Sequence, residues 1–208
     1  MIKNIFFDMG GVLIPLNKER AVEAFKALGV GRFADYLNPF LQKGFFARFE
    51  NGEITAARFR DCVRELSSDK DIADEQIDNA LNLFIDPLPP EREALLRELK
   101  EKYSLFLLSN NNPISVARIT SLFMRDYGYD FKNLFVKTFC SYKMKLSKPS
   151  EEIFHRALEL AGAGSSETLF IDDSPANIEA ASKLGFITCL YDVERGFDEQ
   201  IRRALTNG

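Results

Sequence analysis

Short runs of apolar residues recur along the chain with the pattern of strands that are buried on both faces of a parallel sheet. The predicted strands are Ile2–Phe7, Ser104–Leu108, Thr168–Ile171 and Ile187–Tyr191, with a weaker fifth at Phe135–Phe139. Helical patterns separate the later runs, at Glu91–Lys102, Pro113–Tyr127, Pro149–Ala161 and Pro175–Leu184. Strands that alternate with helices predict an α/β fold, a doubly wound parallel sheet.

The signals at the helix ends agree with this pattern. Asn112 is a suitable N-cap in front of Pro113, which stands at a favoured first helical position. Gly162 and Gly185 follow the last residues of two other predicted helices, where a left-handed residue commonly ends a helix. We therefore expect these helices to begin and end close to the predicted residues.

The stretch between Pro15 and Pro87 interrupts the alternation, because it contains helical patterns and no convincing strand. The predicted helices of this insertion are Lys18–Leu28, Phe33–Phe49, Thr55–Leu66 and Ile72–Phe84. We expect two domains: a core of residues 1–15 and 88–208, and a small all-helical domain of residues 16–87.

Composition narrows the functional classes. The 208 residues are 46% hydrophobic and 28% charged, and the net charge is −4, so a broad basic surface for nucleic acid is not expected. The three cysteines lack CxxC spacing and indicate a reduced, cytoplasmic protein. The first apolar run is short and ends at Asp8, unlike a signal peptide, and no run is long enough for a membrane span.

Polar residues stand at the carboxyl ends of three predicted strands. Asp8 ends the first, Ser109-Asn110 the second and Asp172-Asp173 a later one. Ligands of open parallel sheets bind in the crevice beyond these ends. Each residue alone has a plain structural interpretation, as a turn residue or an N-cap. Three carboxylates that meet at one edge, however, repel one another and suit Mg²⁺.

Three further polar residues are candidates for phosphate binding. Ser109 and Asn110 stand before a helix N-terminus, where a hydroxyl and an amide can donate to phosphate oxygens. Lys148 also stands just before a helix N-terminus. Because the positive end of the helix dipole disfavours a cation there, Lys148 requires a compensating anion. Lys143 and Lys145 are expected to be surface charges, and the single histidine, His155, is expected to be a surface or packing residue.

The combination "FFDMGGVL … LLSNNN … KPSEEIF … FIDDSPANIEAA" resembles the haloacid dehalogenase-like superfamily over the whole chain. The resemblance implies that Asp8 is a nucleophile, that Ser109 and Lys148 are catalytic, and that residues 16–87 are a helical cap. It implies Mg²⁺ bound by Asp8, Asp172, Asp173 and the carbonyl of Gly10, with Asp173 the preferred direct ligand. Ser109, Asn110 and Lys148 would bind the phosphate, and Asn177 would support the site.

The activity that this resemblance implies is hydrolysis of a small phosphorylated metabolite through an aspartyl-phosphate, with a sugar phosphate favoured. The cap sets the substrate in this superfamily. The cap residues proposed to face the site are Lys18, Arg20, Phe45, Phe46, Arg48 and Phe49, near the cap-like stretch "FENGEIT". No nucleic acid or membrane partner is expected, and the chain is expected to be a monomer or homodimer.

Gly10 departs from the phosphatase pattern, in which a second aspartate stands two residues after the nucleophile as general acid–base. Glycine keeps the backbone carbonyl for the metal but supplies no proton donor. If no other group replaces it, the rate is expected to depend steeply on how well the leaving oxygen departs unaided.

Four other functions compete with a phosphatase. A 2-haloacid dehalogenase also lacks the second aspartate but does not resemble this chain at Asp172-Asp173. A non-catalytic protein that binds a phosphorylated ligand would explain Gly10. A signalling receiver domain has its acidic pair after the first strand, and a dinucleotide-binding oxidoreductase has GxGxxG, which "DMGGVL" lacks.

Overall fold

The computed structural model describes residues 1–37 and 43–207 and contains a parallel sheet of five strands in the order β3-β2-β1-β4-β5. The strands are β1 (Asn4–Phe7), β2 (Ser104–Ser109), β3 (Lys137–Cys140), β4 (Thr168–Asp172) and β5 (Ile187–Leu190). All five predicted strands are therefore present, with β3 lying slightly later than its weak apolar run. The α/β fold expected from the sequence is confirmed.

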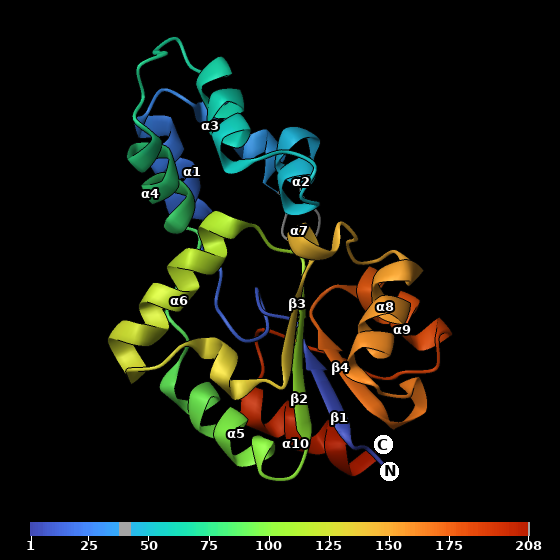
Figure 1. Ribbon diagram of the computed structural model, residues 1–208. Helices are drawn as coiled ribbons and strands as arrows, with labels where there is room; N and C mark the ends of the chain where they lie inside the picture. The colour runs from blue at the N-terminus through green and yellow to red at the C-terminus, as the bar shows by residue number, and fades with distance from the viewer. Residues whose placement is uncertain (38–42, 208) are drawn as a thin grey trace.

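Helices cover both faces of the sheet, as Figure 1 shows. The core helices are α5 (Pro90–Lys100), α6 (Pro113–Tyr127), α7 (Ser141–Met144), α8 (Glu151–Ala161), α9 (Pro175–Lys183) and α10 (Phe197–Asn207), with 3-10 turns η2 (Phe131–Leu134) and η3 (Ser165–Glu167). The four helices predicted for this part are confirmed within a few residues. Helix α10 and the short α7 were not predicted.

The central strands are mostly apolar because both of their faces are covered. In β1, Ile5 and Phe7 pack in one cluster with residues of α5, α6 and α10. Phe6, which points the other way, packs in a second cluster with Phe154 of α8 and Ala181 of α9. The central strand β1 is thus buried on both faces, which fixes the residue that follows it, Asp8, rigidly.

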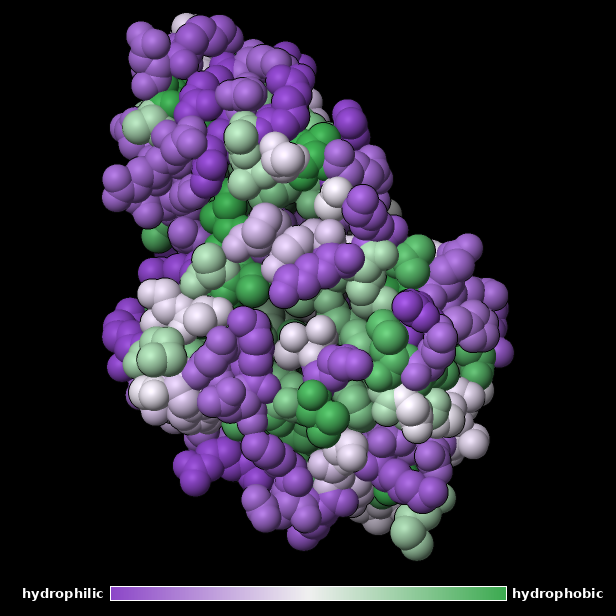
Figure 2. Space-filling model, in the orientation of Figure 1, coloured by the Kyte–Doolittle hydropathy of each residue, from purple (hydrophilic) through white to green (hydrophobic). Residues whose placement is uncertain are grey.

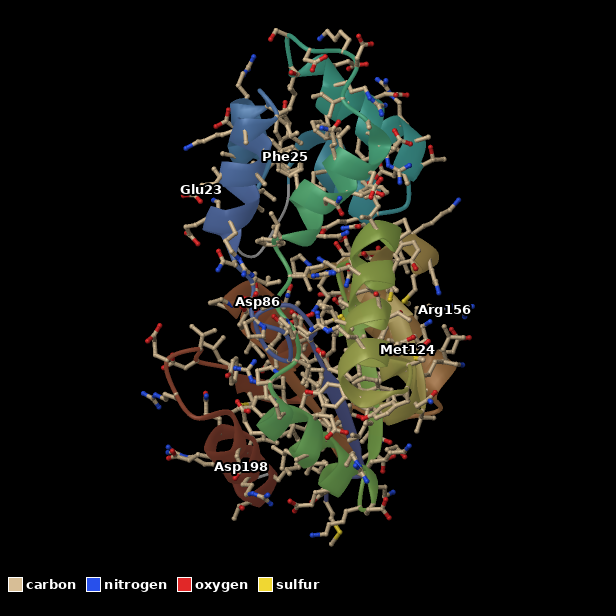
Figure 3. The ribbon with its side chains drawn as sticks, turned by 90° about the vertical axis from the view of Figure 1, so that its left-hand side faces the viewer. Glu23, Phe25, Asp86, Met124, Arg156 and Asp198 are labelled. Carbon is tan, nitrogen blue, oxygen red and sulfur yellow. The ribbon has the colours of Figure 1, made fainter. Side chains whose placement is uncertain are left out.

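The insertion after β1 is helical and has its own hydrophobic cluster. It contains α1 (Lys18–Ala27), η1 (Gly31–Tyr36), α2 (Gly44–Glu50), α3 (Ala56–Glu65) and α4 (Asp74–Asn82). The cluster is rich in phenylalanine, and Phe25 points into it in Figure 3. Polar side chains cover much of the outer surface of the insertion in Figure 2.

The prediction of one helix over Phe33–Phe49 is wrong. The backbone is extended at Leu37 and Lys43, so η1 and α2 are separate. Gly44 has a φ of +56°, in the left-handed region that a continuous right-handed helix excludes. Residues 38–42, which the predicted helix included, lie outside the described residues.

Two neighbouring chain segments join the insertion to the sheet. Leu16 and Ile85 form an isolated antiparallel bridge, and the amide of Asn17 donates to the Phe84 carbonyl at 2.8 Å. Arg20 of α1 forms an ion pair with Asp86, which lies at this junction in Figure 3. No helix within the described residues has the length and apolar character needed to cross a membrane.

Candidate active site

The predicted site residues converge at the carboxyl edge of the sheet, beside the point between β1 and β4 where the strand order reverses. Because β2 and β4 both pair with β1, the polar residues at the three strand ends become neighbours. Asp8, Ser109, Asn110 and Asp173 line a cavity of about 80 Å³ together with residues of the insertion. That volume is far below the roughly 300–1,000 Å³ of sites for drug-sized ligands and suits a group no larger than a phosphate.

Lys148 is a buried cation that two carboxylates hold in place. Its side chain is 1% exposed, and its Nζ lies 2.9 Å from Asp8 Oδ1 and 2.6 Å from Asp172 Oδ2. Burial alone would lower the pKa of Lys148, but the charges of Asp172 and Asp8 outweigh burial and raise it, so the ammonium stays charged. These carboxylates are the compensating anions that the sequence required for a lysine before a helix.

Asp172 uses both carboxylate oxygens for contacts within the protein. Oδ2 pairs with Lys148, while Oδ1 accepts hydrogen bonds from the Ser174 amide and from Asn177 Nδ2, each at 2.9 Å. The residue is fully buried. This arrangement suits a residue that orients Lys148 rather than one that offers a free oxygen to a ligand.

Asp173 contrasts with its neighbour, because no lysine, arginine or side-chain donor among the described residues binds its carboxylate. Its pKa is raised to about 7 by burial first and then by the charges of Asp8 and Asp172. The carboxylate packs against Gly11, whose φ is +83°. Divalent cations such as Mg²⁺ bind carboxylate oxygens, and the unpaired carboxylate of Asp173 faces the cavity.

Asp8 lies between these groups at the end of β1. Its amide donates to the Ile171 carbonyl at 2.9 Å, which ties the residue to β4. Burial raises the pKa of Asp8 to about 6, Lys148 opposes that shift, and Asp172 adds to it. Ligand oxygens of Asp8, Asp172 and Asp173 all lie within 4.8 Å of one another. One ammonium does not neutralise three carboxylates, so this donor set fits a hard divalent cation.

Ser109 and Asn110 stand at the end of β2 and line the cavity. Ser109 is 1% exposed, and within residues 1–37 and 43–207 its hydroxyl donates a single long hydrogen bond, of 3.3 Å to the Asn110 carbonyl. The Asn110 side chain donates to the Lys148 carbonyl and accepts from the Lys148 amide, each at 2.9 Å. Asn110 therefore fixes the backbone of Lys148, a role that its sequence position did not reveal.

Gly10 also lines the cavity, and it has no positive φ. A Cβ at this position would lie 3.0 Å from Leu16 Cδ1, the end of a flexible side chain. The position two residues after Asp8 thus has no acidic side chain, as the sequence indicated.

The insertion contributes two side chains to the cavity from α2, Phe46 and Glu50. Phe46 was among the six predicted candidates, whereas Glu50 was missed, although it stands four residues later and therefore on the same helix face. The other candidates do not line this cavity, although Lys18 lines the larger cleft beside it. Phe45 and Phe49 pack on Phe59. Lys18 donates to the Leu37 carbonyl, Arg20 pairs with Asp86, and Arg48 pairs with Glu53 at the surface.

A second cleft, of about 870 Å³, shares Leu16, Phe84 and Asp173 with the small cavity. It lies between α1 of the insertion and the segment around Tyr191 and Gln200. The small cavity thus has a larger hollow next to it, on the side of the free Asp173 carboxylate.

This constellation on a parallel sheet with a helical insertion after β1 defines a class of hydrolases. The sequence profile of haloacid dehalogenase-like hydrolases matches residues 2–185, and the chain belongs to this family. A D-ribitol-5-phosphate phosphatase of Bacteroides thetaiotaomicron is 32% identical over 198 residues, which cover 95% of each chain. A sesquiterpene phosphatase of Aspergillus oryzae is 27% identical over 89% of this chain and 87% of its own.

Solved structures agree with this assignment. A HAD family enzyme of Bacteroides thetaiotaomicron, in complex with magnesium and inorganic phosphate, superposes with a TM-score of 0.89 at 38% identity, over 96% of this chain and 98% of its own. An L-2-haloacid dehalogenase of Xanthobacter autotrophicus has a TM-score of 0.64 at 18% identity, over 100% of this chain and 84% of its own. That second likeness concerns the fold alone.

Proposed function

We propose that this protein is a Mg²⁺-dependent phosphatase that hydrolyses a small phosphorylated sugar or sugar alcohol. One observation carries the proposal: a buried nucleophile candidate, Asp8, lies between the Lys148 ammonium and the free carboxylate of Asp173. A phosphate bound there would lie between the Lys148 ammonium and a cation held by Asp173, which suits phosphoryl transfer because the reaction depends mainly on positioning and on neutralising charge.

In this proposal Asp8 attacks the phosphorus atom. Its oxygen forms a bond to phosphorus as the bond to the leaving oxygen breaks, and water then hydrolyses the aspartyl-phosphate. Lys148 holds Asp8 Oδ1 and faces the phosphate oxygens, and Ser109 donates its hydroxyl to them. The long 3.3 Å hydrogen bond of Ser109 leaves that hydroxyl available. Asn110, with two hydrogen bonds to the Lys148 backbone, keeps the ammonium in position.

Asp8, Asp173 and the carbonyl of Gly10 would hold the metal, and Asp172 would support them through Lys148. A bound Mg²⁺ would neutralise charge between Asp8 and the phosphate and hold the two in line. The raised pKa values of Asp8 and Asp173 support this metal site. Burial and mutual repulsion disfavour the charged carboxylates, and a bound divalent cation would stabilise them.

The sugar-phosphate class is favoured by the 32% identical relative, a D-ribitol-5-phosphate phosphatase. The cavity itself suits the phosphate group. Residues 16–87 would act as the cap domain and residues 1–15 with 88–208 as the core domain. The separate phenylalanine cluster of the insertion supports this division. The larger cleft beside Asp173 would admit the substrate.

The test is phosphate release from a panel of pentose, hexose and sugar-alcohol phosphates, with Mg²⁺ and with EDTA. The proposal expects hydrolysis that Mg²⁺ supports and EDTA abolishes, with a preference for sugar or sugar-alcohol phosphates. Release of halide from 2-haloacids without metal would instead indicate a dehalogenase. Tight binding of phosphorylated ligands without turnover would indicate a protein that only binds them.

A further inference from the structure

The insertion places a carboxyl group in the active-site cavity that the roles described so far do not use. Glu50 is the last residue of α2 and lines the cavity together with Asp8, Lys148 and Asp173. It is half-buried, so part of its surface remains open to the cavity. The residue comes from the cap side, opposite the sheet edge that carries the nucleophile.

The surroundings of Glu50 favour its neutral, proton-carrying form. No lysine or arginine among the described residues pairs with it, and the charge that acts on it is that of Asp8. A carboxylate at the C-terminus of a helix also meets the negative end of the dipole. Burial first, and then Asp8, raises the pKa of Glu50 to about 8, although a hydrogen bond from the Asn112 side chain opposes the shift.

Contacts with the core hold this part of the insertion firmly over the site. The Ser141 hydroxyl donates to the Glu50 carbonyl at 2.6 Å and accepts from the Asn111 amide at 2.9 Å. Gly52, with a φ of +67°, lies so close to Tyr142 that a Cβ there would be 2.1 Å from its carbonyl oxygen. Asn112, whose side chain caps α6 through Ser115, lines the same cavity as Glu50.

We propose that Glu50 is the general acid–base of this enzyme and takes the place that Gly10 leaves without a side chain. The inference rests on the proposed phosphatase activity. It replaces the expectation from the sequence that the leaving oxygen departs without a protonating side chain.

The proton balance follows in two steps. As Asp8 bonds to phosphorus and the bond to the leaving oxygen breaks, the Glu50 carboxyl gives its proton to that oxygen and an alcohol departs. The Glu50 carboxylate then takes a proton from the water that attacks the aspartyl-phosphate. The bond between phosphorus and Asp8 breaks, and phosphate, the Asp8 carboxylate and protonated Glu50 are regenerated.

The test compares wild type, Glu50→Gln and Glu53→Gln on phosphate monoesters of graded leaving-group pKa, from nitrophenyl phosphate to sugar-alcohol phosphates. The Glu50→Gln substitution keeps the size of the side chain and an acceptor oxygen but removes the acidic proton. Glu53 is the matched control, because it stands in the same segment, is exposed and pairs with Arg48 at the surface. The measured quantity is kcat/KM, which covers the steps up to loss of the leaving group.

We expect Glu50→Gln to lower kcat/KM by about 10²–10⁴-fold for alkyl phosphates and only slightly for nitrophenyl phosphate, which needs no acid. Glu53→Gln should match wild type throughout. An equal loss on every ester, or no loss on any, would overturn the role of Glu50 while the phosphatase proposal stands. A wild type that hydrolyses no ester of the series would overturn the phosphatase proposal and the inference with it.

Discussion

The carboxylate of Asp173 packs directly against the backbone of Gly11, so that a Cβ at residue 11 would lie 2.1 Å from Asp173 Oδ2. Any side chain at residue 11 must therefore displace the proposed metal ligand. Gly11→Ala is expected to raise the Mg²⁺ concentration that gives half-maximal activity at least tenfold. The measurement is phosphate release as a function of Mg²⁺ concentration.

Gly128 provides the control for this substitution. Its φ of +77° is close to that of Gly11, but nothing lies within 4 Å of the Cβ that an alanine would add. Gly128→Ala should therefore cost about 1 kcal/mol of unfolding free energy through backbone strain and leave the Mg²⁺ dependence unchanged. Equal Mg²⁺ dependence of the two variants would contradict the proposed contact between Gly11 and Asp173.

Asp8→Asn is expected to abolish turnover while the protein remains folded. The amide is nearly isosteric with the carboxylate but a poor nucleophile. Because burial already raises the pKa of Asp8 to about 6, loss of its charge should not lower the melting temperature at pH 7. Steady-state phosphate release and thermal unfolding measure the two effects. Residual activity of more than a few per cent, with contamination excluded, would end the case for a covalent intermediate.

Asp172→Asn is expected to affect mainly the stability of the fold, and Asp173→Asn mainly the binding of Mg²⁺. Asp172 holds Lys148 and two further donors, so its substitution is expected to destabilise the protein by on the order of 3 kcal/mol. Asp173 holds no such partner among the described residues, so its substitution should spare stability and weaken Mg²⁺ dependence more strongly. Chemical denaturation and Mg²⁺ titration of activity test this contrast, and the opposite ranking would refute it.

Lys148→Ala should be far more harmful than Lys143→Ala. Lys148 is 1% exposed between two carboxylates, and a charge-assisted contact of this kind is worth about 1.5–3 kcal/mol, or at least about tenfold in kcat/KM. Lys143 is exposed and serves as the control. The comparison uses kcat/KM for a substrate identified in the panel. Similar small losses for both variants would mean that Lys148 does not contact the phosphate.

Stability should depend on pH through Glu50. Its pKa is about 8 when folded and near the ordinary 4.5 when unfolded, so the unfolded chain releases this proton first as pH rises. Wild type should therefore lose unfolding free energy between about pH 5 and pH 8, and Glu50→Gln should lose less. Asp8, Asp173 and Lys148 surround the same cavity in both variants, so the difference between the two curves in EDTA reports Glu50. Parallel curves would contradict a Glu50 that is protonated in the folded protein.

The sequence predicted the sheet and its polar edge because these depend on local pattern. The strand that precedes Asp8 ends in the apolar run Ile5–Phe7, and a parallel sheet brings the ends of β2 and β4 to its sides. The left-handed backbone of Gly44 was not visible in the apolar period of Phe33–Phe49, so one helix was predicted there. Glu50 was missed because its position depends on Ser141, 91 residues away, and on how α2 docks over the sheet.

The contact of Gly52 with Tyr142 and the hydrogen bond from Ser141 to Glu50 bear on how such enzymes can be recombined. A chimera that joined this core to the helical insertion of another relative would exchange the surface that selects the substrate. It would also remove the proton donor, because that donor comes from the insertion and not from the sheet. A chimera of this kind would therefore have to retain residues 49–53 of this chain together with its core.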